Sequence, residues 1–85
     1  MITPIPKHLA AEIKSEWRAS AYTAWRPPVT VEILNAHYNH ADYVGIGIAR
    51  CMPTDTWDAN TGRHIASIRA ERQVLRDIIR AEGKR

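Results

Sequence analysis

Residues 44–49 alternate strictly between branched apolar and small side chains, and this pattern constrains the fold more than any other feature of the sequence. Successive side chains of a strand point to opposite faces, so Val44, Ile46 and Ile48 share one face. The other face carries small side chains only: Gly45, Gly47, Ala49 and Cys51. Glycine inside a strand indicates close approach of another backbone. We therefore expect a strand with a helix packed closely against its small face.

A second strand is predicted from residues 29–33, where apolar and polar side chains alternate with period two, and it is expected to extend as far as His37. Two consecutive prolines, Pro27 and Pro28, exclude a helix at that point in the chain. The residues Asn39–Asp42 favour a turn between the two strands. The strands are expected to form an antiparallel hairpin within residues 25–51.

An N-terminal helix is predicted within residues 1–24. Its start is assigned to Thr3–Pro6, because proline is tolerated in the first turn of a helix. Leu9, Ile13 and Trp17 then recur at i, i+4 and i+8, which is typical of one helix face.

A long C-terminal helix is predicted over residues 63–82, after a loop at residues 52–62 and before a basic tail at residues 83–85. Asp55 and Asp58 are candidate caps for its start. The sequence thus predicts a small single α+β domain ordered helix, strand, strand, helix, with the hairpin packed on the long C-terminal helix. Two strands alone are marginally stable in water, so we also expect a homo-oligomer that supplies strands at the edge of the hairpin.

The composition limits which classes of protein the chain can belong to. The 85 residues form one domain, and the single cysteine, Cys51, favours a reducing compartment. Residues 1–14 hold no apolar signal segment, and no stretch is apolar enough to span a bilayer, so we expect a cytoplasmic protein without a membrane partner. Residues 60–85 hold seven Lys and Arg against three Asp and Glu, which assigns the positive charge to the C-terminal segment.

The segment from Ala49 to Asp58 carries the most distinctive motif, Ala-x-Cys-x-Pro-x-Asp-x-aromatic-Asp. A Gly-x-x-Ile-Ala-x-x-Arg-Ala helix follows it, matched by Gly62, Ile65, Ala66, Arg69 and Ala70. Over residues 44–80 the chain resembles short phage and prophage proteins of unassigned function. It is more distantly similar to phage anti-defence sponges that sequester cyclic nucleotide immune signals. The resemblance implies a nucleotide ligand and the cytoplasm of an infected or lysogenic bacterium.

The first turn of the C-terminal helix is a candidate anion site, because free N–H groups and the helix dipole favour phosphate. Gly62, Arg63 and His64 lie in that turn, and Trp57 is positioned to stack on a base. Two alternatives stay open: Asp58 caps the same N–H groups, and Trp57 fills the core under the loop.

Four arginines form a stripe on the C-terminal helix, which we call the arginine stripe: Arg69, Arg72, Arg76 and Arg80. Like charges at i+4 repel by a few tenths of a kcal/mol per pair, so the stripe is either a solvated face or is stabilised by anions nearby. These are supplied by a nucleotide, by DNA or RNA phosphate, or internally by acidic side chains of the fold, namely Glu12, Glu16 and Glu32.

Metal and catalytic sites are not expected. His37, His40, Cys51 and His64 are suitable residue types, but they form only one closely spaced pair of potential ligands. No third group at a recognised spacing orients His64 as a base for Cys51. The leading hypothesis is a non-enzymatic phage accessory protein that binds a nucleotide signal without a cofactor. The alternatives are a small DNA- or RNA-binding module that uses the arginine stripe, and an inhibitor that docks on a host protein complex.

Overall fold

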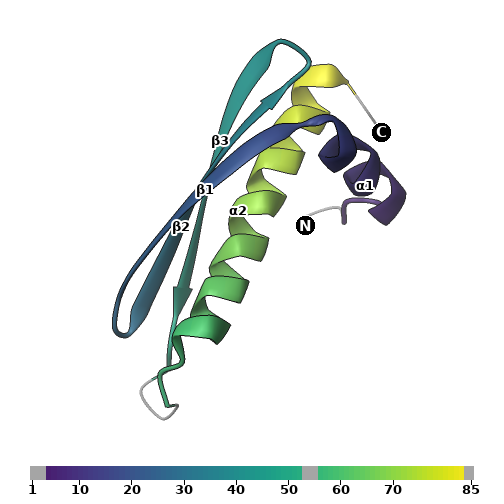
Figure 1. Cartoon of the computed structure of the whole chain (residues 1–85). Helices are drawn as coiled ribbons and strands as arrows, with labels where there is room; N and C mark the ends of the chain where they lie inside the picture. Colours follow the sequence, from purple (N-terminus) through teal and green to yellow (C-terminus); the bar gives the residue numbers. More distant parts are fainter. Residues whose placement is uncertain (1–3, 53–55, 84–85) are drawn as a thin grey trace.

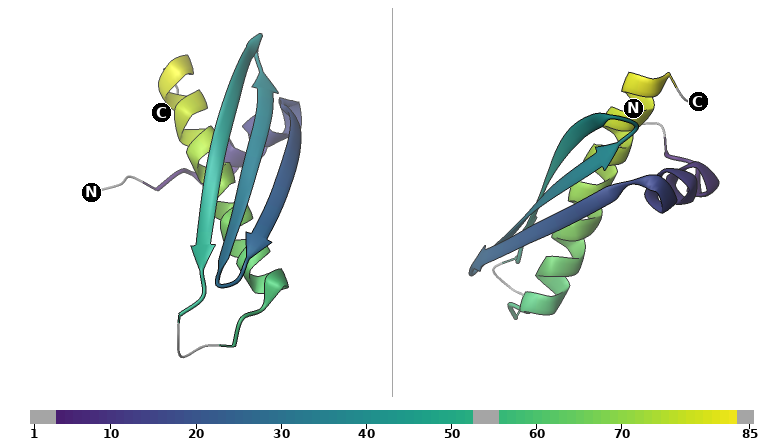
Figure 2. Two further views of the ribbon diagram at one scale, coloured as in Figure 1. Left: turned by 90° about the vertical axis from the view of Figure 1, so that its left-hand side faces the viewer. Right: turned by 45° about the horizontal axis from the view of Figure 1, so that its top comes forward.

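The computed structural model describes residues 4–52 and 56–83, and its elements follow in the order helix, three strands, helix (Figure 1). The elements are α1 (Lys7–Glu16), β1 (Arg18–Arg26), β2 (Val29–Tyr38), β3 (Ala41–Arg50) and α2 (Ala59–Glu82). The strands form one antiparallel sheet in the order β1-β2-β3. The long helix α2 lies along one face of this sheet, and α1 lies beside the C-terminal half of α2 (Figures 1 and 2). The predicted α+β class and the long C-terminal helix packed on the sheet are confirmed.

The third strand is the main departure from the sequence prediction, which extended the N-terminal helix to residue 24. The helix ends at Glu16, and the Trp17 N–H bonds the Ile13 carbonyl oxygen at 3.1 Å. The chain then enters β1, which pairs with β2 from Arg18 opposite His37 to Arg26 opposite Val29. The hairpin edge that was expected to receive a strand from another copy is therefore occupied by the chain's own β1.

The turn between β2 and β3 consists of Asn39 and His40, both with positive φ, at 49° and 66°. Two central residues of positive φ form the tight hairpin turn that matches strand twist, and asparagine tolerates this conformation. Asn39 also donates from Nδ2 to the carboxylate of Glu82, at 2.9 and 3.0 Å. The tip of the hairpin is thereby attached to the last turn of α2.

The close contact between α2 and β3 explains the small side chains of that strand. A Cβ atom at Gly47 would collide with the carbonyl oxygen of Ala66, and one at Gly45 with that of Ala70. The helix backbone therefore rests directly on the strand. This confirms the expectation drawn from the alternation of residues 44–49.

The core lies between α2, the sheet and α1. Ile13, Val74 and Ile78 are completely buried. Other buried members of the cluster are Leu9, Leu34, Ala36, Tyr38, Ala70 and Leu75. Since α1 and α2 both contribute, the N-terminal helix belongs to the same domain as the sheet.

Each end of α2 is fixed by a capping residue. Asp58 caps the first turn, and Gly83, with φ of 67°, donates its N–H to the Ile79 carbonyl oxygen at the other end. The helix begins at Ala59, four residues before the predicted start. The second cap candidate, Asp55, and the last two residues of the basic tail lie outside the described residues. Thr3, the first residue of the start proposed for the N-terminal helix, also lies outside them, and α1 begins at Lys7, directly after Pro6. Within residues 4–52 and 56–83, no helix is both long and apolar enough to cross a bilayer.

Candidate ligand cavity beside the C-terminal helix

The first turn of α2 is occupied by its own cap. Asp58 Oδ1 accepts a hydrogen bond from the Asn60 N–H at 2.9 Å, and Oδ2 accepts one from Thr61 Oγ1 at 3.1 Å. The carboxylate therefore lies where a bound phosphate would receive N–H donors. Of the two interpretations of this turn, capping by Asp58 is the one confirmed.

The remaining residues predicted at this turn have different environments. Gly62 packs against the side chain of Thr30, and a Cβ atom there would meet Thr30 Oγ1 at 2.5 Å. Arg63 and His64 were predicted in the first turn, but α2 begins at Ala59, so both lie in the second turn, and both are exposed. The glycine is thus explained by packing, while the two basic side chains extend into solvent.

Trp57 is half-buried, between the two predicted extremes of core and free surface. It lines a cavity of about 360 Å³ beside the start of α2, together with Pro28, Met52 and Ile65. The floor of this cavity includes Thr30, which is 1% exposed and whose Oγ1 has no hydrogen-bond partner among the described residues. The arrangement is mainly apolar and carries the carboxylate of Asp58 at its rim.

The arginine stripe divides into members with different roles. Arg69 donates from Nη1 to the carbonyl oxygen of Ile48 at 2.6 Å. One turn later, Gln73 Oε1 accepts the N–H of Ile46 at 3.0 Å. Both backbone groups point away from β2, so α2 seals the outer edge of β3 with two side chains. Arg69 is therefore part of the edge of the sheet.

Internal acidic residues do not neutralise the stripe. Across the described ranges, the ion pairs are Lys14 Nζ with Glu71 Oε1 at 2.6 Å and His37 Nδ1 with Asp42 Oδ1 at 2.7 Å. Glu32, which was one of the expected acidic partners, is 5% exposed and accepts a hydrogen bond from Thr23 Oγ1 at 3.1 Å. Internal pairing of the stripe is thus absent among the residues that the structure describes, for Glu12 and Glu16 as well.

Arg72 and Arg76 line a second and larger cavity, which we call the N-terminal cavity. Its volume is about 720 Å³, and it lies between the segment that leads into α1 and the middle of α2. Its lining consists of Pro4, Ile5, Lys7, Ile68, Glu71, Arg72, Leu75 and Arg76. Helix geometry brings the two arginines onto adjacent turns of one face, because they are four residues apart.

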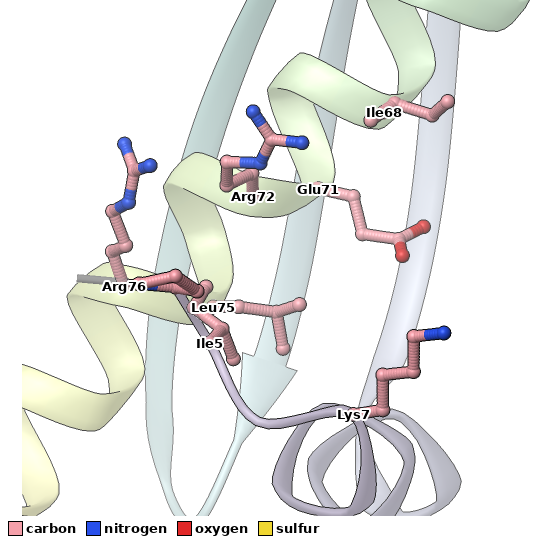
Figure 3. A pocket seen from close by; sticks show the side chains of 8 residues that line it. Ile5, Lys7, Ile68, Glu71, Arg72, Leu75 and Arg76 are labelled. Atoms are coloured by element: carbon pink, nitrogen blue, oxygen red, sulfur yellow. The ribbon is translucent and has the colours of Figure 1, made fainter. Parts of the chain in front are cut away.

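The side chains of the N-terminal cavity form an apolar floor between charged walls. Figure 3 shows Arg72 and Arg76 extending in the same direction, with Ile5 and Leu75 beside them and Lys7 on the side of Glu71. Glu71 is held in its ion pair with Lys14. Three cations and one paired carboxylate therefore surround the floor.

Arg76 has the most unusual environment of the cavity. Its side chain is partly buried, and its Nε atom is inaccessible to solvent and has no hydrogen-bond partner among the described residues. A buried donor without a partner is costly, at about 1–3 kcal/mol. Arg80, the last member of the stripe, is exposed in the final turn of α2, where a cation suits the helix dipole.

Sequence reasoning missed Lys7 and Ile5 as members of this cavity. They lie more than 60 positions from Arg72 along the chain. No local spacing connects the two segments, so their meeting depends on how α1 packs beside α2. The basic character of Lys7 was the only available signal.

Metal-binding side chains are not gathered in the part of the chain described, where no group of three or more His, Cys, Asp and Glu could hold an ion. His37 contacts Asp42 on the sheet, whereas His64 lies at the start of α2. Comparison of the chain with protein-family models and with curated proteins found no match.

Proposed function

We propose that this protein binds a small anionic ligand, a nucleotide by class, in the N-terminal cavity and sequesters it without converting it. The observation that carries the proposal is that Lys7, Arg72 and Arg76 line one cavity, none of them in an ion pair among the described residues. Arg76 supports it further, because this partly buried arginine lines the cavity and has no acidic partner among the described residues.

The chemistry of the lining favours a nucleotide over inorganic phosphate. Ile5, Ile68 and Leu75 provide an apolar surface for a base, while the arginines provide donors for phosphate oxygens. The volume of about 720 Å³ lies within the range of roughly 300–1,000 Å³ found for small-molecule sites. A ligand with both an apolar ring and a phosphate uses both parts of the lining.

The biological setting of the proposal follows from the resemblance of residues 44–80 to short phage and prophage proteins. It supports an accessory role in the cytoplasm of the infected bacterium, with a nucleotide immune signal as ligand. The proposed ligand site keeps Arg72 and Arg76 of the arginine stripe, which the sequence suggested, but it does not include the first turn of α2, which the sequence also suggested.

The test is calorimetric titration of the protein with inorganic phosphate, AMP, ATP and a cyclic dinucleotide at one ionic strength. We expect a nucleotide to bind more tightly than phosphate alone. Arg72→Gln and Arg76→Gln should each weaken binding by about 10- to 100-fold, the cost of a charge-assisted hydrogen bond. Arg63→Gln, at an exposed position in the second turn of α2, is the matched control and should leave affinity unchanged.

Two results would contradict the proposal. If no nucleotide in the panel bound, nucleotides would be excluded as the ligand. An equal loss of affinity in Arg63→Gln and Arg72→Gln would move the site away from the N-terminal cavity.

A nucleic-acid-binding function is the second candidate, because Arg80 continues the i+4 series of Arg72 and Arg76 and is exposed. An extended row of cations contacts several phosphates of a duplex or a single strand. This function predicts affinity that falls steeply with salt and a loss in Arg80→Gln. Nucleotide binding in the N-terminal cavity predicts no effect of Arg80→Gln, since Arg80 does not line that cavity.

A further inference from the structure

The sheet carries its large apolar side chains on the face that points away from α2. On β3 the residues under the helix are Gly45, Gly47 and Ala49, which are buried. The alternate residues Val44, Ile46 and Ile48 are 51%, 50% and 52% exposed. A sheet with one solvated face normally alternates apolar inward and polar outward, whereas this strand carries its largest apolar side chains outward.

The other two strands continue this apolar surface. Antiparallel pairing aligns Tyr22 with Ile33, and Ile33 with Ile46, in one row across the sheet. We define the open-face patch as the apolar residues of this face: Tyr22, Ala24, Val29, Val31, Ile33, Val44, Ile46 and Ile48. Tyr22 is 66% exposed, so the patch is open across all three strands.

The patch can form the apolar centre of an interface, whose whole area is about 800 Å² on each partner in a standard complex. Strand geometry gives the patch dimensions of roughly 20 Å along the strands and 10–14 Å across them. The charged residues at the ends of the patch extend the contact beyond this apolar area, as a polar rim does around the apolar centre of an interface. The regular rows of branched side chains in the patch suit packing against a second sheet, at about 10 Å between the two backbones.

Charges at the ends of the patch favour a second copy of the chain as the occupant. On β3, Asp42 and Arg50 stand four residues on either side of Ile46. A two-fold axis that lies between the sheets and crosses the strands at Ile46 brings Asp42 of each copy over Arg50 of the other. Arg26 pairs with Val29, which pairs with Arg50, so a second arginine lies at the same end.

The acidic end is available for such a contact. Asp42 accepts from His37, yet its side chain stays 85% exposed. Arg18 shares this end, and the same axis places it opposite Arg26 of the other copy at the β1 edge of the sheet. The Asp42–Arg50 contacts at the β3 edge offset this repulsion, so burial of the open-face patch supplies the main stabilisation of the dimer.

We propose that two copies of this chain associate face to face through the open-face patch, with Ile46 on the two-fold axis and Asp42 of each copy opposite Arg50 of the other. The dimer is a sandwich of two sheets with one α2 helix on each outer side. The N-terminal cavity lies on the α2 side of the sheet, so each copy keeps its cavity exposed. The proposed dimer and the proposed ligand site therefore do not depend on each other.

The first experiment is sedimentation equilibrium of the wild-type chain and two variants. Ile46→Lys places two ammonium groups on the axis and should weaken dimerisation by at least about 100-fold, since an unpaired buried charge is strongly unfavourable. Ile68→Lys is the matched control, because Ile68 is 42% exposed on α2, away from the patch. It should leave the dimer unchanged, and circular dichroism should report the native fold in both variants.

A charge exchange tests the orientation independently of packing. Asp42→Arg should weaken the dimer by about tenfold, and the double variant Asp42→Arg/Arg50→Asp should restore most of that loss. Recovery supports the two-fold arrangement, and equal weakness of the single and double variants overturns it.

Two outcomes of sedimentation overturn the whole interface. If the wild-type chain stays monomeric at every accessible concentration, a second copy of the chain does not cover the open-face patch. A dimer that persists in Ile46→Lys must be joined elsewhere, for example through the outer edge of β1.

Discussion

Arg69 Nη1 lies 2.6 Å from the carbonyl oxygen of Ile48, so this arginine binds the edge of the sheet while Arg72, three residues later, faces a cavity. We expect Arg69→Ala to lower the free energy of unfolding by about 1 kcal/mol, because the edge carbonyl loses a charged donor but gains water. Arg72→Ala should change it by less than about 0.5 kcal/mol, as is usual for exposed side chains. Urea unfolding of both variants measures the difference, and equal values would contradict the assigned roles.

The close contact at Gly47 predicts a large effect from a single methyl group. In Gly47→Ala, the new Cβ atom collides with the backbone of Ala66 and Ala70, and neither can move without displacing α2. We expect a loss of about 3 kcal/mol in the free energy of unfolding, typical of overpacking.

Gly83→Ala is the control for that substitution. Nothing lies within 4 Å of a Cβ atom at Gly83, so only its φ of 67° opposes the change. Its expected cost is about 1 kcal/mol, the strain of one residue in the left-handed region. Thermal unfolding followed by circular dichroism compares the two variants, and a Gly47→Ala protein as stable as Gly83→Ala would contradict the close packing.

Two threonines on the sheet should respond with opposite signs to the same substitution. Thr30 Oγ1 is buried without a hydrogen-bond partner in the described part of the chain, whereas Thr23 Oγ1 donates to Glu32. Thr30→Val should raise the free energy of unfolding by about 1 kcal/mol, because it removes a hydroxyl that lacks a partner. Thr23→Val should lower it by a similar amount, about 1 kcal/mol, because a nearly buried carboxylate loses its donor.

Chemical denaturation of both threonine variants provides the comparison. Destabilisation by Thr30→Val would show that its hydroxyl has a structural role that the geometry does not reveal.

Asp58 is predicted to stabilise α2 through its cap. Asp58→Ala should lower the free energy of unfolding by about 1 kcal/mol, while Asp58→Asn should retain most of the stability, because an amide oxygen also accepts the Asn60 N–H. Helicity and melting temperature of the two variants measure this, and indistinguishable behaviour would argue against the cap.

The sequence was informative where a local pattern determines the contact. Alternation of residues 44–49 predicted both β3 and the close helix, since a strand face without large side chains fills its space with a neighbouring backbone. The cap at Asp58 was also predicted, because it depends on neighbouring backbone alone.

The strand β1 was not predictable in the same way. Its alanines are good helix formers, and the helical spacing of Leu9, Ile13 and Trp17 leads directly into them. Pairing with β2 determines its conformation, and that interaction is not local. Tyr22, Thr23 and Trp25 were the residues whose strand preference carried the opposite signal.

Only part of the candidate site was predicted, because some of its contacts are also not local in the sequence. The arginine stripe was visible as an i+4 series, but the partner of Arg69 is a backbone carbonyl, which no side-chain pattern reveals. The contribution of Lys7 to the N-terminal cavity depends on the docking of α1 against α2, and helix docking is set by packing across the whole domain.

The position of α1 in the core also bears on the order of events during synthesis. Leu9 and Ile13 belong to one buried cluster with Leu75 and Ile78, and Lys14 pairs with Glu71 across 57 positions. A ribosome releases the apolar face of α1 long before the residues that cover it exist. The hairpin can form early from nearby segments, but the core closes only after α2 has emerged, so a nascent chain stalled before Leu75 exposes the side chains that are most deeply buried in the finished protein.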